Sequence, residues 1–219
     1  MSIKSKFVTA AAALALIGGT GAAGTLTANA ATLKCGPACS DFYSRAFGTG
    51  SVLDTLHGGR IGQPTTLARA SRAGQGEDFG VDGLGRVNDF FRAGLISGGL
   101  NALYGGLFAY EIEYTPGGSP SDLCLGVGTA PGAGTPVVLE PCGMNASTIW
   151  IFDPEPTSTG TYYALISAAT SHNFRHPYSL TALVPGFPLV TAPLATGGPV
   201  LAHQLWSAAQ GVLPASAAH

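Results

Sequence analysis

LCLGVGTAPGAGTPVVLEPCGMNASTIWIF, the stretch from Leu123 to Phe152, predicts three short strands joined by turns. Its apolar runs are rich in β-branched and aromatic residues, and Gly, Pro and Asn interrupt them, which is the composition that strands and tight turns require. Cys124 and Cys142 bracket the first two runs. A disulfide between them would close a short loop and contribute on the order of 3 kcal/mol to stability. The stretch therefore predicts one compact β-unit.

The same pattern recurs twice elsewhere in the chain. Each copy has a glycine two residues before a proline, at Gly62-Gln63-Pro64, Gly134-Thr135-Pro136 and Gly186-Phe187-Pro188. Each copy then closes on an aromatic residue, which is Phe79, Trp150 or Trp206. A further strand precedes each copy, at Phe42, Tyr43 and Phe47, at 108–114 and at 162–166. Three copies of about four strands predict a three-lobed, closed, all-β structure without exposed sheet edges.

The interval between the first two copies is longer than the interval between the second and third. The excess lies at residues 80–106, where VNDFFRAG, from Val87 to Gly94, predicts one or two helical turns capped by Asn88. The glycine pairs at 98–99 and 105–106 predict mobile loops. We therefore expect a short helical or irregular insertion between the first and second repeats.

The amino-terminal 30 residues are typical of a secretory signal peptide. Lys4 and Lys6 precede an apolar run, and Ala28-Asn29-Ala30 matches the small-residue cleavage signal. The apolar run is too short to remain as a membrane span. The Ala- and Gly-rich signal indicates a bacterial source, and we expect the mature protein, from residue 31, to be secreted into the extracellular medium.

Composition narrows the partners of the mature chain. Of 10 basic residues, two leave with the signal peptide, so 8 basic residues remain against 12 acidic ones. The net charge near −4 argues against nucleic acid and anionic membranes as partners. About 189 mature residues suffice for one all-β domain with its own core, and we expect a monomer.

Four cysteines in a secreted chain most simply form two disulfides. Sequence alone permits three pairings. We favour Cys35 with Cys39 and Cys124 with Cys142, because each pair is local and leaves no cysteine unpaired. The segment 31–46 would then carry the Cys35–Cys39 loop, ahead of the three-lobed domain at 47–219 with repeats at about 47–107, 108–160 and 161–214.

These residues resemble the ricin-type β-trefoil (ricin B-like lectin), a family of carbohydrate-binding modules with three-fold pseudo-symmetry. The resemblance rests on Cys124-Leu125, the Gly134-x-Pro136 turn, Cys142 and Trp150, and on Gln204-Leu205-Trp206, which matches the family's Q-x-W signature. It implies a β-trefoil fold of about twelve strands. It also implies that Phe79, Trp150 and Trp206 enter a common core and that Gln204 pairs with nearby backbone.

The resemblance places one acidic residue at the position where the family binds sugar. In that family an Asp after the first strand of a repeat accepts hydrogen bonds from sugar hydroxyls, while an aromatic ring stacks on the apolar face of the sugar. Asp54 holds this position in the first repeat, whereas Gly126 and Thr181 hold it in the other two. We therefore expect carbohydrate binding through the first lobe, with hydroxyl partners at His57, Arg60 and Gln63. The alternative for Asp54 is a carboxylate that caps local backbone N–H groups.

Other constellations carry less weight. Glu111 and Glu113 alternate with apolar residues along one strand, which predicts a solvent-facing pair rather than catalytic carboxylates. No phosphate loop or nucleophile elbow is present in the sequence, and we expect no enzyme activity, no cofactor and no metal. The leading hypothesis is a secreted, non-catalytic lectin-like protein. The alternative is a trefoil scaffold for protein contact, such as an inhibitor of a secreted protease.

Overall fold

The structure, a computed structural model, describes residues 40–209 except 57, 71–74, 129, 171–173 and 195–197. The expected signal peptide at 1–30 and the expected Cys35–Cys39 disulfide lie outside the described residues. Within the described part the strands are β1 Asp41–Ser44, β2 Ser51–Asp54, β3 Thr66–Arg69, β4 Phe79–Arg86, β5 Phe108–Tyr114, β6 Leu123–Gly126, β7 Val138–Pro141, β8 Ile149–Thr157, β9 Gly160–Ser167, β10 Tyr178–Thr181, β11 Val190–Pro193 and β12 Leu205–Ala209. The helices are α1 Val87–Arg92 and α2 Gly98–Tyr104, with 3-10 turns η1 Gly48–Gly50, η2 Gln75–Glu77, η3 Pro116–Gly118 and η4 Ala202–Gln204.

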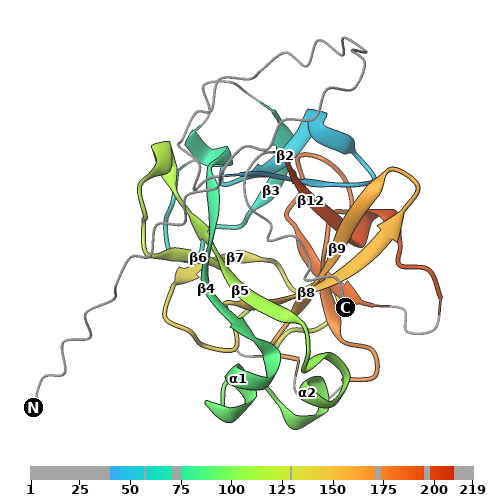
Figure 1. Ribbon diagram of the computed structural model, residues 1–219. Coiled ribbons are helices and arrows are strands. Elements are labelled where there is room, and N and C mark those ends of the chain that lie inside the picture. The colour runs from blue at the N-terminus through green and yellow to red at the C-terminus, as the bar shows by residue number, and fades with distance from the viewer. Residues whose placement is uncertain are drawn as a thin grey trace, which may run out of the picture. The chain divides into compact units, whose positions relative to one another are not determined.

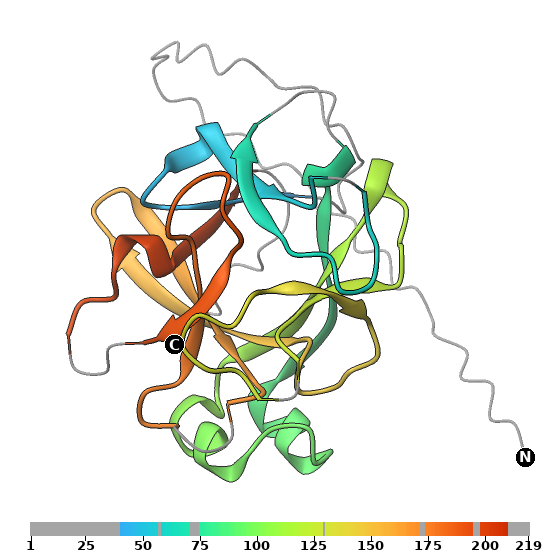
Figure 2. The same ribbon diagram turned by 180° about the vertical axis from the view of Figure 1, so that it is seen from behind.

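Six strands form a closed barrel in the order β1, β12, β9, β8, β5 and β4 (Figure 1). A bridge between Ser40 and Phe79 joins β4 back to β1 and completes the ring. The other six strands form the antiparallel hairpins β2–β3, β6–β7 and β10–β11, which Figure 2 shows in cyan, yellow and orange. This confirms the prediction of an all-β, three-fold pseudo-symmetric trefoil of about twelve strands. The barrel begins with β1, ahead of residue 47 where the sequence placed the start of the domain.

The predicted Gly-x-Pro turns hold the three hairpins together. Gly62, Gly134 and Gly186 have φ values of 79°, 80° and 85°, in the left-handed region that glycine adopts without strain. Each turn brings the strand that follows it to the pseudo-three-fold axis. There Thr65 N donates to Val137 O at 2.9 Å, Val137 N to Leu189 O at 2.8 Å, and Leu189 N to Thr65 O at 2.8 Å. These three bonds form a closed ring, which we call the axial ring.

The closing aromatic residues of the three repeats lie in the barrel core. Phe79 and Trp150 are 0% exposed and Trp206 is 1% exposed. The indole N–H of Trp150 donates to Leu125 O at 3.0 Å, and that of Trp206 donates to Leu180 O at 2.9 Å. Trp150 therefore ties β8 to β6, and Trp206 ties β12 to β10. Phe79 has no N–H group and makes only the packing contacts.

Two further features fix individual repeats. The side-chain amide of Gln204, 1% exposed, donates to Ser179 Oγ at 2.9 Å and to Pro193 O at 3.1 Å, so it joins β10 and β11 of the third repeat. In the second repeat a disulfide joins Cys124 and Cys142, with Cα atoms 5.1 Å apart. The disulfide crosses from β6 to the residue that follows β7.

The insertion of the first repeat contains two helices at the tip of the β4–β5 hairpin (Figure 1). Helix α1 forms where the sequence predicted it, but the expected cap Asn88 lies inside the helix, and Arg86 holds the N-cap position. The glycine pair at 98–99 begins helix α2 instead of a loop, because Ser97 caps it and accepts a hydrogen bond from Leu100 N. No helix in the described residues is long and apolar enough to cross a membrane.

The insertion explains why β8 is apolar on both faces. Trp150 and Phe152 point into the barrel core, whereas Ile149 and Ile151 belong to a second cluster with residues of both helices. The insertion contributes Val87, Phe90, Ile96 and Leu100 to this second cluster. A strand that is covered on both faces requires a continuous apolar run, which is the pattern at 149–152.

Candidate functional site

The carboxylate of Asp54 lies at the end of β2, where the loop of the first lobe begins. Its Oδ1 accepts a hydrogen bond from Leu56 N, so the carboxylate caps the start of the loop. Gly76 makes room for it, because a Cβ at that position would lie 2.6 Å from Asp54 Oδ1. Asp54 is half-buried and Leu56, with φ of 53°, is 52% exposed. The carboxylate is therefore fixed in direction while it retains contact with solvent.

The residues that the sequence grouped with Asp54 differ in their surroundings. Arg60 is exposed. Gln63 is turned into the loop, and its side-chain amide donates to Thr55 O. His57 lies outside the described residues. Gln63 therefore shapes the loop, whereas Arg60 and the neighbouring Ile61, which is 69% exposed, present a cation and an apolar group to solvent.

An aromatic ring lies under this loop. Tyr114 is 4% exposed, and a Cβ at Gly59 would collide with its ring, so the loop backbone rests directly on the tyrosine. Burial raises the pKa of Tyr114. The hydroxyl of Thr55 lowers that pKa, and the charges of Asp78 and Asp54 raise it. The tyrosine hydroxyl thus lies among polar groups beneath the loop, and its ring is covered and supports the loop.

The second lobe also has a carboxylate at the place that Asp54 occupies in the first, and the sequence did not reveal it. It belongs to Glu140 on β7, which pairs with Cys124 and reaches diagonally across to Gly126. A Cβ at Gly126 would lie 2.7 Å from Glu140 Cγ and 2.8 Å from Oε2. Glu140 Oε1 accepts from Gly128 N at 2.6 Å, as Asp54 accepts from Leu56 two residues further on. Glycine does hold the Asp54 position of the second repeat, as the sequence shows, but a carboxylate from the facing strand lies there instead.

The third lobe differs from both. Thr181 holds the position of Asp54, and its hydroxyl donates to Ser179 O at 3.0 Å. Ala192 pairs with Ser179 and so stands where Glu140 stands in the second lobe. In the first lobe the same position is Ala68, opposite Val52. Each of the first two lobes thus has one carboxylate at this place, from opposite strands of the hairpin, and the third has neither.

The pair Glu111 and Glu113 is buried, and the prediction of a solvent-facing pair is wrong. They are 3% and 7% exposed. Glu111 Oε1 accepts from Gly143 N at 3.2 Å, from Met144 N at 3.0 Å and from the hydroxyl of Thr148. Glu113 Oε1 accepts from two backbone N–H groups, those of Ser121 and Asp122. Both carboxylates hold the loops of the second lobe.

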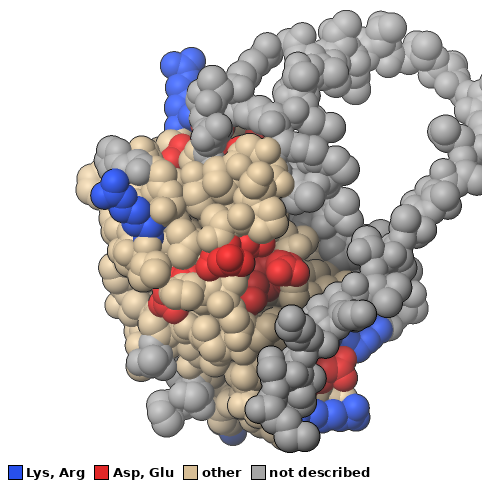
Figure 3. All heavy atoms as spheres, turned by 90° about the vertical axis from the view of Figure 1, so that its left-hand side faces the viewer, with Lys and Arg blue, Asp and Glu red and all other residues tan. Residues whose placement is uncertain are grey.

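Acidic groups gather on the side of the molecule that carries β4 and β6, and Figure 3 shows them at the centre of that face. Burial raises the pKa of Glu113, the two backbone N–H groups lower it, and the charges of Asp82 and Asp122 raise it. Residues 108–160 contain six Asp or Glu and no Lys, Arg or His. Glu111 and Glu113 are buried, but no basic side chain offsets the other four, so the surface of the second lobe disfavours anionic ligands.

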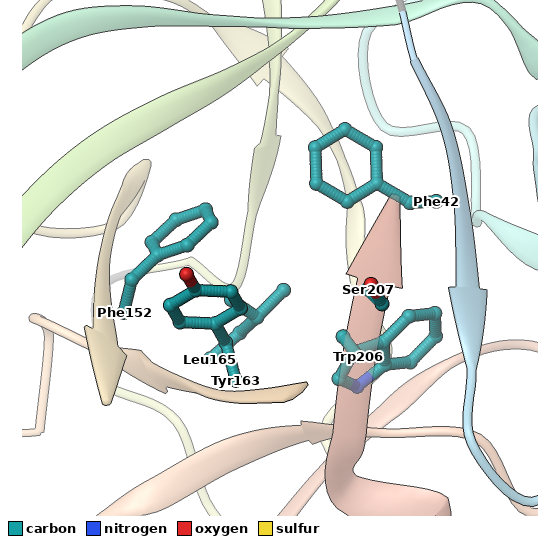
Figure 4. Close-up of a pocket in the computed structure, with 6 residues that line it drawn as sticks. All are labelled: Phe42, Phe152, Tyr163, Leu165, Trp206 and Ser207. Carbon is teal, nitrogen blue, oxygen red and sulfur yellow. The ribbon is translucent and has the colours of Figure 1, made fainter. Parts of the chain in front are cut away.

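A small hollow lies between barrel strands, lined by aromatic and aliphatic side chains and one serine (Figure 4). It has no room for a water molecule, so it is a packing gap and offers no binding site. Its lining residues are Phe42, Phe152, Tyr163, Leu165, Trp206 and Ser207. Among the described residues no group of three His, Cys, Asp or Glu side chains is placed to hold a metal ion.

Comparison with solved structures supports the fold. The designed three-fold symmetric protein ThreeFoil matches with a TM-score of 0.52 and 15% identity, over 78% of this chain and 96% of that chain. A mosquitocidal holotoxin matches with a TM-score of 0.51 and 12% identity, over 80% of this chain and 17% of that chain. A Polyporus squamosus lectin, solved with a sialylated glycan epitope, has a TM-score of 0.49 and 13% identity, over 80% and 49%.

No protein-family model matches the sequence, and the curated proteins give no match. The structural matches at this level of identity show the β-trefoil fold.

Proposed function

We propose that the chain is a secreted, non-catalytic protein that binds carbohydrate through the first lobe. The observation that carries the proposal is the half-buried carboxylate of Asp54, oriented by Leu56 N at the start of the loop that follows β2. A carboxylate has acceptor positions for several hydrogen bonds, so the bond from Leu56 leaves others for sugar hydroxyls. Hydrogen bonds to a charged acceptor are the stronger ones in a polar site.

The surroundings of Asp54 suit a sugar ring. Arg60 is exposed on the same loop and supplies donors, and Leu56 and Ile61 supply exposed apolar surface for the C–H face of the ring. Tyr114 lies beneath the loop, so in this lobe aliphatic side chains replace the stacked aromatic residue that the family resemblance implies. Such contacts favour a weak, shallow site for one or two sugar units.

A glycan array and affinity gels with the mature protein test this proposal, with Asp54→Ala beside the wild type. We expect Asp54→Ala to weaken binding at least about tenfold, because the loss of a hydrogen bond to a charged group costs about 1.5–3 kcal/mol. Asp89→Ala is the matched control, since Asp89 is an exposed carboxylate in the insertion helix α1. Absence of glycan binding, or binding that Asp54→Ala leaves intact, contradicts the site.

A second candidate function, protein contact, is favoured by the loop of the third lobe. Leu183, Val184 and Phe187 are 57%, 52% and 64% exposed within five residues of chain. A cluster of large apolar side chains on a loop is typical of protein interaction surfaces. Inhibition assays against secreted proteases test this function, with Phe187→Ser as the variant. Inhibition that Phe187→Ser removes, together with a negative glycan array, would favour it over carbohydrate binding.

A further inference from the structure

We propose that the second lobe contains a second carbohydrate site in which Glu140 performs the role of Asp54. This inference rests on the proposed function. It adds a site in the second repeat, where Gly126 holds the position of Asp54. The two carboxylates reach equivalent places from different strands, Asp54 from the end of β2 and Glu140 from β7. The absence of a side chain at Gly126 is what admits the carboxylate of Glu140.

The backbone contacts of the two carboxylates correspond. Asp54 accepts from the N–H group two residues after its own position, that of Leu56. Glu140 accepts from Gly128 N at 2.6 Å, which is two residues after Gly126. The same N–H group of the repeat therefore orients the carboxylate in both lobes, and the carboxylate oxygens face the same loop.

Glu140 retains hydrogen-bonding capacity for a ligand. Its Oε2 lies 2.5 Å from Ser147 Oγ, whose single proton is shared between Glu140 and Asn145 Oδ1, so each carboxylate oxygen has at most one protein donor. A carboxylate has about four acceptor positions, which leaves room for hydroxyl donors. Glu140 is half-buried, and Asn145 is exposed on the adjoining loop, where its amide supplies a further polar group. This arrangement matches a pair of neighbouring sugar hydroxyls.

The charge of the second lobe defines the class of sugar. With six carboxylates and no basic residue in 108–160, the lobe favours neutral glycans over sialylated or sulfated ones. The first lobe has an exposed cation, Arg60, on the loop that follows Asp54, so a ban on anionic sugars does not extend to it. The two sites would therefore accept a neutral sugar in common, and a protein with two sites can bridge two glycan chains.

Amide NMR titration of the full mature protein tests the inference one lobe at a time. The N–H groups of Leu56 and Gly128 report on the two carboxylates, because each donates to one of them. The probes are the methyl glycosides of galactose, glucose, mannose and N-acetylglucosamine. We expect saturable shifts at both amides with at least one probe. A shift at Leu56 without one at Gly128 overturns the second site and leaves the proposed function in place.

Absence of any shift at both amides overturns the second site together with the proposed function. A shift at Gly128 alone supports the second site and contradicts the assignment of the first lobe.

Variants separate a binding role of Glu140 from a structural role. Glu140→Ala should weaken binding at the Gly128 reporter at least about tenfold and leave the response of Leu56 unchanged. The double variant Gly126→Asp/Glu140→Ala returns the carboxylate to the repeat position, where the removal of Glu140 has made room. We expect it to restore the Gly128 response. Ser147→Ala removes the loop contact but keeps the carboxylate, and it should retain binding.

Retention of the Gly128 response in Glu140→Ala would overturn the role of Glu140. So would a loss of response in Glu140→Ala that the double variant fails to restore while its fold, judged by the amide spectrum, is intact.

Discussion

The first and second lobes place a carboxylate at the same point of the trefoil by different routes. In the first lobe Asp54 stands on the strand that ends at the loop, and the β3 position equivalent to Glu140 is Ala68, opposite Val52. In the second lobe the strand ends in Gly126, and Glu140 comes from β7 instead. The comparison shows that a functional position of a repeat is defined by its location in the fold, and not by one position in the aligned sequence. Two strands of the hairpin can supply it, and the loss of one side chain can be offset by the gain of another.

The two lobes also differ in how they are held together. The second lobe has a disulfide, a buried tryptophan with a hydrogen bond, and two buried glutamates that bind its loops. The first lobe has Phe79 at the tryptophan position and two helices at the tip of its hairpin. Variants that make one lobe like the other therefore measure how much each of these features contributes to the free energy of unfolding.

The largest effect is expected from removal of the disulfide of the second lobe. Cys124→Ser/Cys142→Ser opens a loop with a sequence separation of 18 residues, and we expect the free energy of unfolding to fall by about 3 kcal/mol. Urea unfolding of the variant and the wild type, with Cys35 and Cys39 kept in both, measures the change. A decrease below about 1 kcal/mol would show that the second lobe is held chiefly by its packing.

Trp150→Phe gives the second lobe the closing residue of the first. The variant leaves Leu125 O without its buried donor and leaves a small cavity, so we expect a loss of about 2 kcal/mol in urea unfolding. Trp206→Phe is the matched control, because Trp206 makes the same bond to Leu180 O. Equal losses would show that this hydrogen bond stabilises the second and third lobes equally. A loss confined to one variant would contradict the equivalence of the second and third lobes.

Substitutions at Gly126 on β6 and Glu140 on β7 should change stability less. Gly126→Ala places a Cβ against Glu140 and should destabilise the protein by about 1.5 kcal/mol through overpacking. In the background of Glu140→Ala the same substitution should cost little, because the colliding carboxylate is absent. A double-mutant cycle from urea unfolding measures this coupling. Additive effects would show that Glu140 moves aside without cost.

The smallest effect is expected where the insertion of the first lobe meets the second lobe. Burial raises the pKa of Asp153 on β8 to about 6, and the charge of Glu155 adds to the shift. Because the folded state binds this proton more tightly than the unfolded chain, stability should fall as pH rises from 3.8 to about 6. Asp153→Asn should remove this loss and stabilise the protein by about 1 kcal/mol at pH 7, since partial exposure screens the effect.

Thermal or urea unfolding of Asp153→Asn at pH 7 and below pH 3.8 checks the sign. The difference from wild type should vanish at the lower pH, where the carboxyl group is protonated in both states. A difference that persists there would assign the effect to packing instead of charge.

The sequence predicts the hairpin framework well because that framework depends on local chemistry. The left-handed glycine at Gly62, Gly134 and Gly186 is a backbone requirement, and it appears in the sequence as a fixed spacing from proline. Helix α2 was missed because Gly98 and Gly99 favour a loop in isolation. Its stability comes from Leu100, which packs on the barrel in a cluster that no local pattern reveals.

The candidate site was predictable only in part. Asp54 stands at the aligned position of its repeat, and the structure places its carboxylate at the loop. Glu140 escaped prediction because it is separated from Gly128 by 12 residues and reaches it across a strand pair. A search of the facing strand for a carboxylate opposite each missing Asp would have found it. Burial of Glu111 and Glu113 escaped for a similar reason, since loops from elsewhere in the chain cover them.

The axial ring ties the folding of each lobe to the presence of all three. Thr65 and Val137 are 72 residues apart, so no bond of the ring forms early by local contact. A fragment with two lobes would keep one of the three hydrogen bonds. One backbone N–H and one backbone C=O at the axis would then lack their partners. The protein should therefore fold slowly and in a single cooperative step, and isolated repeats of this chain should not persist as independent units.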